Sequence, residues 1–102
     1  MAISNTVLST TGNVIYTSTN NSVVSVMYFC NTDSTARDID VYLVPNGGAV
    51  SANTQIYKSV QIAGADTFVV DMEKIVLSDG DTIEAKASLD NVVTATVSYV
   101  GI

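Results

Sequence analysis

The stretch DIDVYLV at residues 38–44 decides the fold class, because its polar and apolar side chains alternate from Asp38 to Leu43. A period of two is the spacing of a β-strand that buries one face and exposes the other. The side chains that we expect to face inward are Ile39, Val41 and Leu43. The side chains that we expect to face outward are Asp38, Asp40 and Tyr42. The stretch therefore predicts a half-buried strand.

Working outward from this strand, β-branched residues and turn residues predict other short strands along the whole chain. They are expected at residues 6–10, 13–17, 23–31, 55–62, 67–71, 82–87 and 92–100, with 74–77 as a strand or an irregular connection. The turns between them include the run Pro45-Asn46-Gly47-Gly48 and the run Ser78-Asp79-Gly80-Asp81, whose residue types suit tight turns. No helical periodicity of useful length interrupts the pattern.

In two of these strands, alternation assigns each side chain to one of the two faces of the sheet. In residues 23–31, one face is expected to carry Val24, Val26 and Tyr28, and the other Val23, Met27 and Phe29. In residues 55–62, one face is expected to carry Ile56, Lys58, Val60 and Ile62, and the other Tyr57, Ser59 and Gln61. Small inward residues, Ala85, Ala87 and Ala95, would allow two sheets to approach closely.

About eight evenly spaced strands predict an all-β antiparallel β-sandwich of the jelly-roll or immunoglobulin-like kind. Tryptophan and a cysteine pair, which mark true immunoglobulin domains, are missing. The 102 residues fit one domain. We expect it to span residues 13–102, preceded by an N-terminal arm at residues 1–12 that either folds onto its own domain or reaches a neighbour.

Charge and composition limit the partners. The formal net charge is −6 and only four residues are Lys or Arg, so nucleic acid and anionic membranes are not expected as partners. No segment is apolar for the length of a membrane span. Only 14% of residues are charged, which favours contact with other protein chains.

Few residues of the sequence are of the types that usually carry out catalysis. The sequence therefore predicts a structural or binding protein that is not an enzyme. Histidine is absent, so a serine or cysteine nucleophile would lack its usual base. Cys30 is expected to be a buried thiol, and no cofactor is predicted. Asp38 and Asp40 are interpreted as solvent-facing rather than as a hydrolytic pair. The turn Asp79-Gly80-Asp81 suits either a calcium site or, with greater weight, an ordinary turn.

Candidate interface residues come from the arm, the outward tyrosines and the loop after residue 44. Tyrosines on the outward side of strands are suited to protein contacts. The loop at residues 45–53 is either mobile or ordered against a neighbouring subunit. The interface candidates are Ile3, Val7, Leu8, Tyr42, Tyr57, Asn46, Gly47 and Gly48.

The order of several short motifs resembles a family of small virion structural proteins of tailed phages, particularly those of marine and cyanobacterial hosts. The motifs are IYT at 15–17, VYLVPNGG at 41–48, NTQIY at 53–57, EKIVL at 73–77, GDTIEA at 80–85 and VTATVSYVGI at 93–102. The resemblance covers the chain from about Val14 onward. It implies a β-sandwich subunit of a phage particle, made in the host cytoplasm and located in the virion.

Two classes of function are left open by this resemblance. The favoured one is a capsid decoration or cement protein that stabilises the head shell, forms a homo-oligomer, preferably a trimer, and contacts the major capsid protein or other virion proteins. The alternative is a tail, fibre or collar component that binds a host receptor. A hydrolase reading is the weakest of the three, because no imidazole is present.

Overall fold

The computed structural model describes residues 2–71 and 74–102, and nine β-strands make up its regular structure. The strands are β1 (Ala2–Val7), β2 (Asn13–Thr17), β3 (Ser22–Asn31), β4 (Arg37–Val44), β5 (Gln55–Ile62), β6 (Thr67–Val70), β7 (Ile75–Leu77), β8 (Thr82–Ala87) and β9 (Val93–Gly101). No helix occurs in the described residues, so none of them could cross a membrane as a helix.

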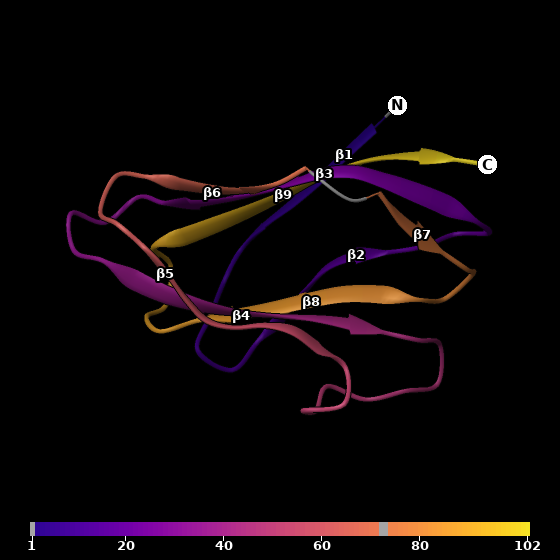
Figure 1. Ribbon diagram of the computed structural model, residues 1–102, viewed down its shortest axis with the longest axis horizontal. Helices are drawn as coiled ribbons and strands as arrows, with labels where there is room; N and C mark the ends of the chain where they lie inside the picture. The colour runs from indigo at the N-terminus through magenta and orange to yellow at the C-terminus, as the bar shows by residue number, and fades with distance from the viewer. Residues whose placement is uncertain (1, 72–73) are drawn as a thin grey trace.

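The strands form two antiparallel sheets that lie one above the other (Figure 1). One sheet has the order β1-β9-β3-β6, and β7 pairs with the same edge of β3 as β6 does. This sharing is possible because β3 has 10 residues: Met27 to Cys30 pair with β6, and Ser22 to Val24 pair with β7. The other sheet has the order β2-β8-β4-β5. The predicted all-β antiparallel sandwich is confirmed.

The core lies between the two sheets and takes the inward side chain of every second residue. Its largest fully buried side chains include Phe29, Leu8, Met27, Ile39 and Ile83. The three alanines expected at inward positions are 1%, 5% and 0% exposed for Ala85, Ala87 and Ala95. Because their side chains are short, larger residues such as Phe29 fit opposite them without leaving voids.

A bulge changes the face assignment within β3. The register of β3 against β9 shifts between Val24 and Val26, and the Ser25 hydroxyl donates a hydrogen bond of 3.1 Å to the Ser98 carbonyl. An extra residue in one strand reverses the alternation beyond it. Val24 and Met27 are therefore both buried, whereas Tyr28 is 42% exposed. The prediction that Val24 shares a face with Tyr28 is wrong for this reason.

The first strand begins earlier than the predicted 6–10. Residues 2–7 form β1, which pairs with β9 of the same chain at the edge of the five-stranded sheet. Leu8 follows directly, is completely buried, and its N–H donates to the Val93 carbonyl at 2.8 Å. In this structure the N-terminal segment thus packs on its own domain.

The end of β3 is fixed by a buried amide. Asn31 is 0% exposed, and its Nδ2 donates to the carbonyls of Thr35 at 2.9 Å and of Ile62 at 3.0 Å. Its Oδ1 accepts a hydrogen bond of 3.0 Å from the N–H of Asp33. Since Ile62 ends β5 in the other sheet, this one side chain links the two sheets.

Candidate functional site

The two sheets differ in charge, and this difference locates the polar site. Charged residues occur in the strands of the four-stranded sheet at Arg37, Asp38, Asp40, Lys58, Glu84 and Lys86. The strands of the five-stranded sheet contain no Asp, Glu, Lys or Arg. The charged groups that belong to strands are therefore concentrated on the four-stranded sheet.

A hollow of about 310 Å³ opens on this outer face, and we call it the polar cleft. It is lined by Thr10, Asp38, Asp40, Ser59, Lys86, Ala87 and Ser88. Asp38 and Asp40 are two residues apart on β4, so their side chains leave the sheet on the same side. Lys86 of β8 is the register partner of Asp40, which places these two side chains next to each other.

Ser59 enters the cleft because β5 has a bulge. Ile39 pairs with Val60, but Val41 pairs with Tyr57, so Lys58 and Ser59 together face the single residue between Ile39 and Val41. Ser59 has a φ of 52°, in the left-handed region that non-glycine residues seldom adopt. Bulges and strained residues of this kind redirect side chains and are concentrated near functional sites.

Asp40 holds the bulge and the neighbouring amine together. Its Oδ1 accepts a hydrogen bond of 2.6 Å from the Ser59 N–H, and its Oδ2 lies 3.8 Å from Lys86 Nζ. The side chains of Lys86 and Asp40 are 41% and 23% exposed, so water screens this ion pair and its contribution to stability is small. The cleft therefore presents two carboxylates, one ammonium group and the hydroxyls of Ser59, Ser88 and Thr10 in one place.

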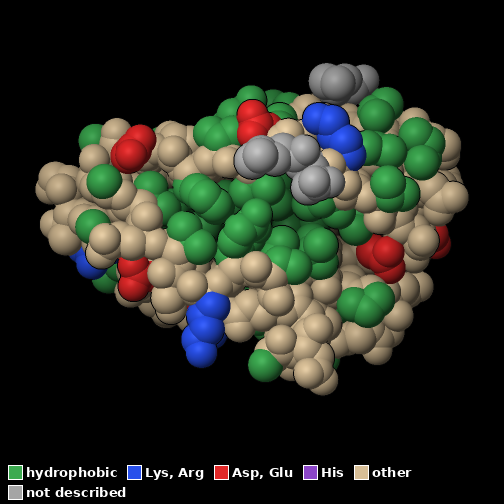
Figure 2. Space-filling model, in the orientation of Figure 1, with side chains coloured by type: hydrophobic (Ala, Val, Ile, Leu, Met, Phe, Trp, Pro, Cys, Tyr) green, Lys and Arg blue, Asp and Glu red, His purple; other side chains and the backbone are tan. Residues whose placement is uncertain are grey.

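The bulge also corrects the predicted faces of β5. Tyr57, Val60 and Ile62 pack on the core, whereas Ile56 is 41% exposed. The ring of Tyr57 meets that of Phe68 edge-on at 5.5 Å between centroids, across the side of the sandwich where β5 faces β6. Figure 2 shows hydrophobic side chains gathered on this side. Tyr57 is thus partly buried against the core, and the prediction from alternation that it faces outward is wrong.

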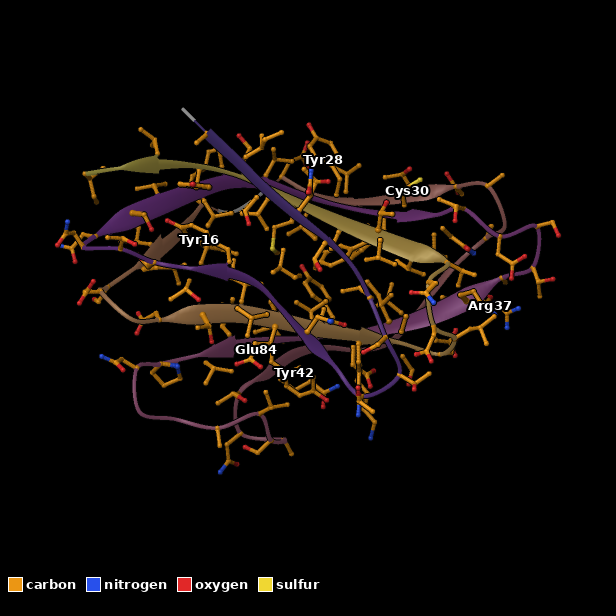
Figure 3. The ribbon with its side chains drawn as sticks, turned by 180° about the vertical axis from the view of Figure 1, so that it is seen from behind. Tyr16, Tyr28, Cys30, Arg37, Tyr42 and Glu84 are labelled. Atoms are coloured by element: carbon orange, nitrogen blue, oxygen red, sulfur yellow. The ribbon has the colours of Figure 1, made fainter. Side chains whose placement is uncertain are left out.

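Tyr42 points outward from β4 as predicted, but it is only 6% exposed. It pairs with Glu84 across the sheet, and the two lie together on the four-stranded layer in Figure 3. A small hollow of about 130 Å³ beside it is also lined by Val50 of the loop that follows β4. The position of Tyr42 under this loop leaves little of its ring available for a partner.

The other interface candidates are placed as follows. Ile3 and Val7 of β1 are 66% and 44% exposed. Asn46, Gly47 and Gly48 are exposed in a turn, in which the Gly48 N–H donates to the Pro45 carbonyl at 2.8 Å. Leu8 is buried in the core and has no surface to offer a neighbour. For the exposed residues, contact with another chain stays a prediction.

Carboxylates of the 78–81 turn bind backbone groups. Asp79 Oδ1 accepts from the Asn20 N–H at 2.7 Å, and the two oxygens of Asp81 accept from the N–H groups of Asn46 at 2.9 Å and Ser78 at 2.8 Å. Gly80 has a φ of +83°, which this turn requires. These bonds are the chemistry of an ordinary turn. Among the described residues, no group of three or more Cys, Asp or Glu is placed to hold a metal ion.

Cys30 is half-buried, so the prediction that its thiol is buried is wrong. The bulge at Ser25 turns it, with Tyr28, to the outer side of the five-stranded sheet, where Figure 3 shows both residues. Its register partners are Thr94 and Thr67, so no charged residue of the sheet lies beside its thiol to favour a thiolate. Cys30 is therefore a poor candidate for a nucleophile.

Comparison with known families gives one match, which covers most of the sandwich. A family model described as Clp protease matches residues 2–96, and the chain therefore belongs to the Clp protease family. No curated protein and no solved structure matches it.

This match corrects three expectations. The resemblance to virion proteins of tailed phages is wrong, and so are the roles drawn from it, the capsid decoration or cement protein and the receptor-binding tail component. The expectation that the chain is not an enzyme is wrong as well, because the family is one of proteases. Motifs such as GDTIEA and VTATVSYVGI are strand and turn patterns that unrelated β-proteins share, which explains the error.

Sequence reasoning missed Ser59 and Lys86. The signal for Ser59 was present in the spacing of its apolar neighbours, since Tyr57, Val60 and Ile62 are three and then two residues apart. This spacing fits a strand only if one extra residue is inserted between 57 and 60. Lys86 had no such signal, because its nearness to Asp40 depends on pairing between strands 46 residues apart in the chain.

Proposed function

We propose that this chain hydrolyses peptide bonds in the polar cleft, with Ser59 as the nucleophile. The observation that carries the proposal is the left-handed bulge at Ser59, which brings a hydroxyl into the same hollow as two carboxylates and an ammonium group. Membership of the Clp protease family supports peptide-bond hydrolysis as the reaction.

Ser59 is favoured over Thr10 and Ser88 because it is the one of the three that lies at the β5 bulge, where its N–H is fixed by Asp40, and because its Oγ has no hydrogen-bond partner among the described residues. The Ser88 Oγ, by contrast, accepts a hydrogen bond of 3.1 Å from the Asp38 N–H. A hydroxyl without a competing partner is free to donate its proton to a base of the cleft.

The sequence contains no histidine for the usual triad, and the amine of Lys86 is paired with Asp40, so we assign the base of this cleft to a carboxylate. Both oxygens of Asp40 already face donors, which leaves Asp38 as the base. Lys86 is an ammonium group paired with Asp40, so it is a donor and its role is to stabilise the negative oxygen of the tetrahedral intermediate.

Hydrolysis in this proposal passes through an ester of the substrate's acyl group with Ser59. Ser59 Oγ forms a bond to the peptide carbonyl carbon, and its proton passes to the Asp38 carboxylate. The intermediate expels the peptide amine, which takes that proton from Asp38, and an ester on Ser59 remains. Water then attacks the ester, with Asp38 again accepting and returning the proton, and the acid product leaves. Because a carboxylate is a weaker base than imidazole, we expect slower turnover than a histidine-based protease shows.

The test is release of fluorescence from heavily fluorescein-labelled casein by the purified chain. We expect measurable turnover by the wild type, and a loss of about 100-fold or more for Ser59→Ala and for Asp38→Asn. Ser34→Ala is the matched control, because Ser34 is an exposed serine outside the cleft. Circular dichroism should show that each variant keeps the β-fold.

Two results would overturn the proposal. Absence of turnover by the folded wild-type chain would remove the hydrolytic function from it. Turnover that survives Ser59→Ala while the fold is intact would remove Ser59 as the nucleophile.

A further inference from the structure

The outer face of the five-stranded sheet has the composition of an interface. The 32 residues of β1, β3, β6, β7 and β9 include no charged side chain, although the whole chain contains 14 charged residues. Depletion of charge is the feature that separates the centre of a protein interface from ordinary surface. We call this outer side the neutral face.

Large apolar side chains are exposed on the neutral face. They are Ile3 (66%), Val7 (44%), Tyr28 (42%), Val69 (42%), Val76 (68%) and Val100 (39%). Strand register groups four of them: Tyr28 lies beside Val69, and Val23 lies between Val76 and Val100. Ile3 and Val7 lie at the other edge, beyond the polar residues Ser98 and Thr94 of β9. Several large apolar side chains exposed on one uncharged face favour contact with protein.

The polar residues of the same face suit a contact between proteins. Thr94 and Thr96 of β9 line a shallow hollow of about 320 Å³ together with Asn5 and Val7 of β1. Hydroxyl and amide groups lose their bound water at a lower free-energy cost than charged groups do, and they can form hydrogen bonds with a partner instead. The charged residues described at the rim of this face include Lys74, whose Nζ lies 3.3 Å from the Ser25 carbonyl, and Asp71, which directly follows β6.

We propose that the neutral face binds the same face of a second copy of this chain, and that the two copies form a two-fold symmetric dimer. The net charge of −6 makes contact between the charged surfaces of two copies unfavourable, whereas two neutral faces meet without bringing carboxylates together. A two-fold axis also makes one patch sufficient for both partners.

The size of the face fits this proposal. The sheets are stacked along the intermediate dimension of the molecule (Figure 1), so the neutral face is spanned by the dimensions of 38 and 21 Å. Their product, roughly 800 Å², bounds the outline of the face and is comparable with the area of about 800 Å² that each partner contributes to an interface of standard size. The proposal is independent of the chemistry in the polar cleft, which lies on the other sheet.

Sedimentation equilibrium over a series of protein concentrations tests the proposal. We expect the wild type to have twice the 10.7 kDa mass of one chain at tens of micromolar. Val69→Glu and Ile3→Glu should each weaken association by at least about 100-fold, because the dimer would bury two copies of the new carboxylate. Val14→Glu is the matched control, since Val14 is 49% exposed on β2 of the other sheet.

The dependence of association on salt concentration is a second test of the dimer. Association through neutral faces should be unchanged or strengthened between 50 and 500 mM NaCl, because salt screens the repulsion between two acidic chains. A monomeric wild type at these concentrations would overturn the proposal. A dimer that persists in Val69→Glu and Ile3→Glu but is lost in Val14→Glu would overturn it as well. So would a wild-type dimer that dissociates when salt is added.

Discussion

At the scale of single residues, Asn31 shows how one polar side chain fixes the geometry of the sandwich. The side chain is fully buried and satisfies carbonyls from the loop after β3 and from the end of β5. A buried amide is tolerated only when its donors and acceptor are paired. The sequence did not reveal this role, because Ile62 is 31 positions away from Asn31 and no local pattern connects them.

Replacement of Asn31 by Ala should lower the free energy of unfolding by about 3 kcal/mol, since buried carbonyls would lose their donors. Urea denaturation followed by circular dichroism measures the change. Asn21→Ala, at an exposed position, should change stability by less than about 0.5 kcal/mol. Equal stability of the two variants would contradict the role of Asn31 as a link between the sheets.

At the scale of elements, the bounds of most strands were predictable from β-branched content and turn residues, whereas the faces of bulged strands were not. The predicted 13–17 and 82–87 coincide with β2 and β8, and the 38–44 strand differs from β4 by one residue. The faces of β3 and β5 were predicted wrongly because each has a bulge, at Ser25 and at Lys58-Ser59. A bulge moves every later side chain to the other face, so one local irregularity changes the assignment of a whole strand.

The connection between β3 and β4 contains an ion pair whose effect depends on pH. Arg37 Nε and Nη2 donate to Asp33 Oδ2 at 2.9 and 2.6 Å, and the Ser34 N–H donates to Asp33 Oδ1 at 2.7 Å. The Arg37 hydrogen bonds, followed by that of Ser34, lower the pKa of Asp33 below its ordinary value of 3.8. A lowered pKa in the folded state stabilises the fold above the unfolded-state pKa, and this stabilisation is lost as pH falls through the folded-state pKa.

Asp33→Asn should therefore be less stable than the wild type at pH 7 and should approach the stability of the wild type near pH 2.5. The difference at pH 7 should be small, because the side chains of Arg37 and Asp33 are 25% and 24% exposed and water screens the pair. Urea midpoints of the two proteins at both pH values measure it, and Arg37→Gln should reproduce the result. A difference that is the same at both pH values would show that the carboxylate charge is not responsible.

At the scale of the whole molecule, the alternation and spacing of strands predicted the class of fold but not the site. Charged residues were visible in the sequence, yet the fact that those within strands all belong to one sheet is known only from the strand order. Asp38 and Asp40 were recognised as a pair on one strand face, whereas Ser59 and Lys86 reach them through pairing of β4 with β5 and β8. The family was misjudged because strand and turn motifs recur in unrelated β-proteins, and the match to the Clp protease family replaces that interpretation.

The central claim is that Ser59 in the polar cleft is a reactive nucleophile, and covalent labelling tests it most directly. The folded wild-type chain is treated with a fluorophosphonate probe, which labels activated serines, and the modified peptide is located by mass spectrometry. We predict a single adduct on Ser59, lost with Asp38→Asn and retained with Ser34→Ala. Absence of an adduct on the folded chain, or an adduct at another serine, would contradict the account.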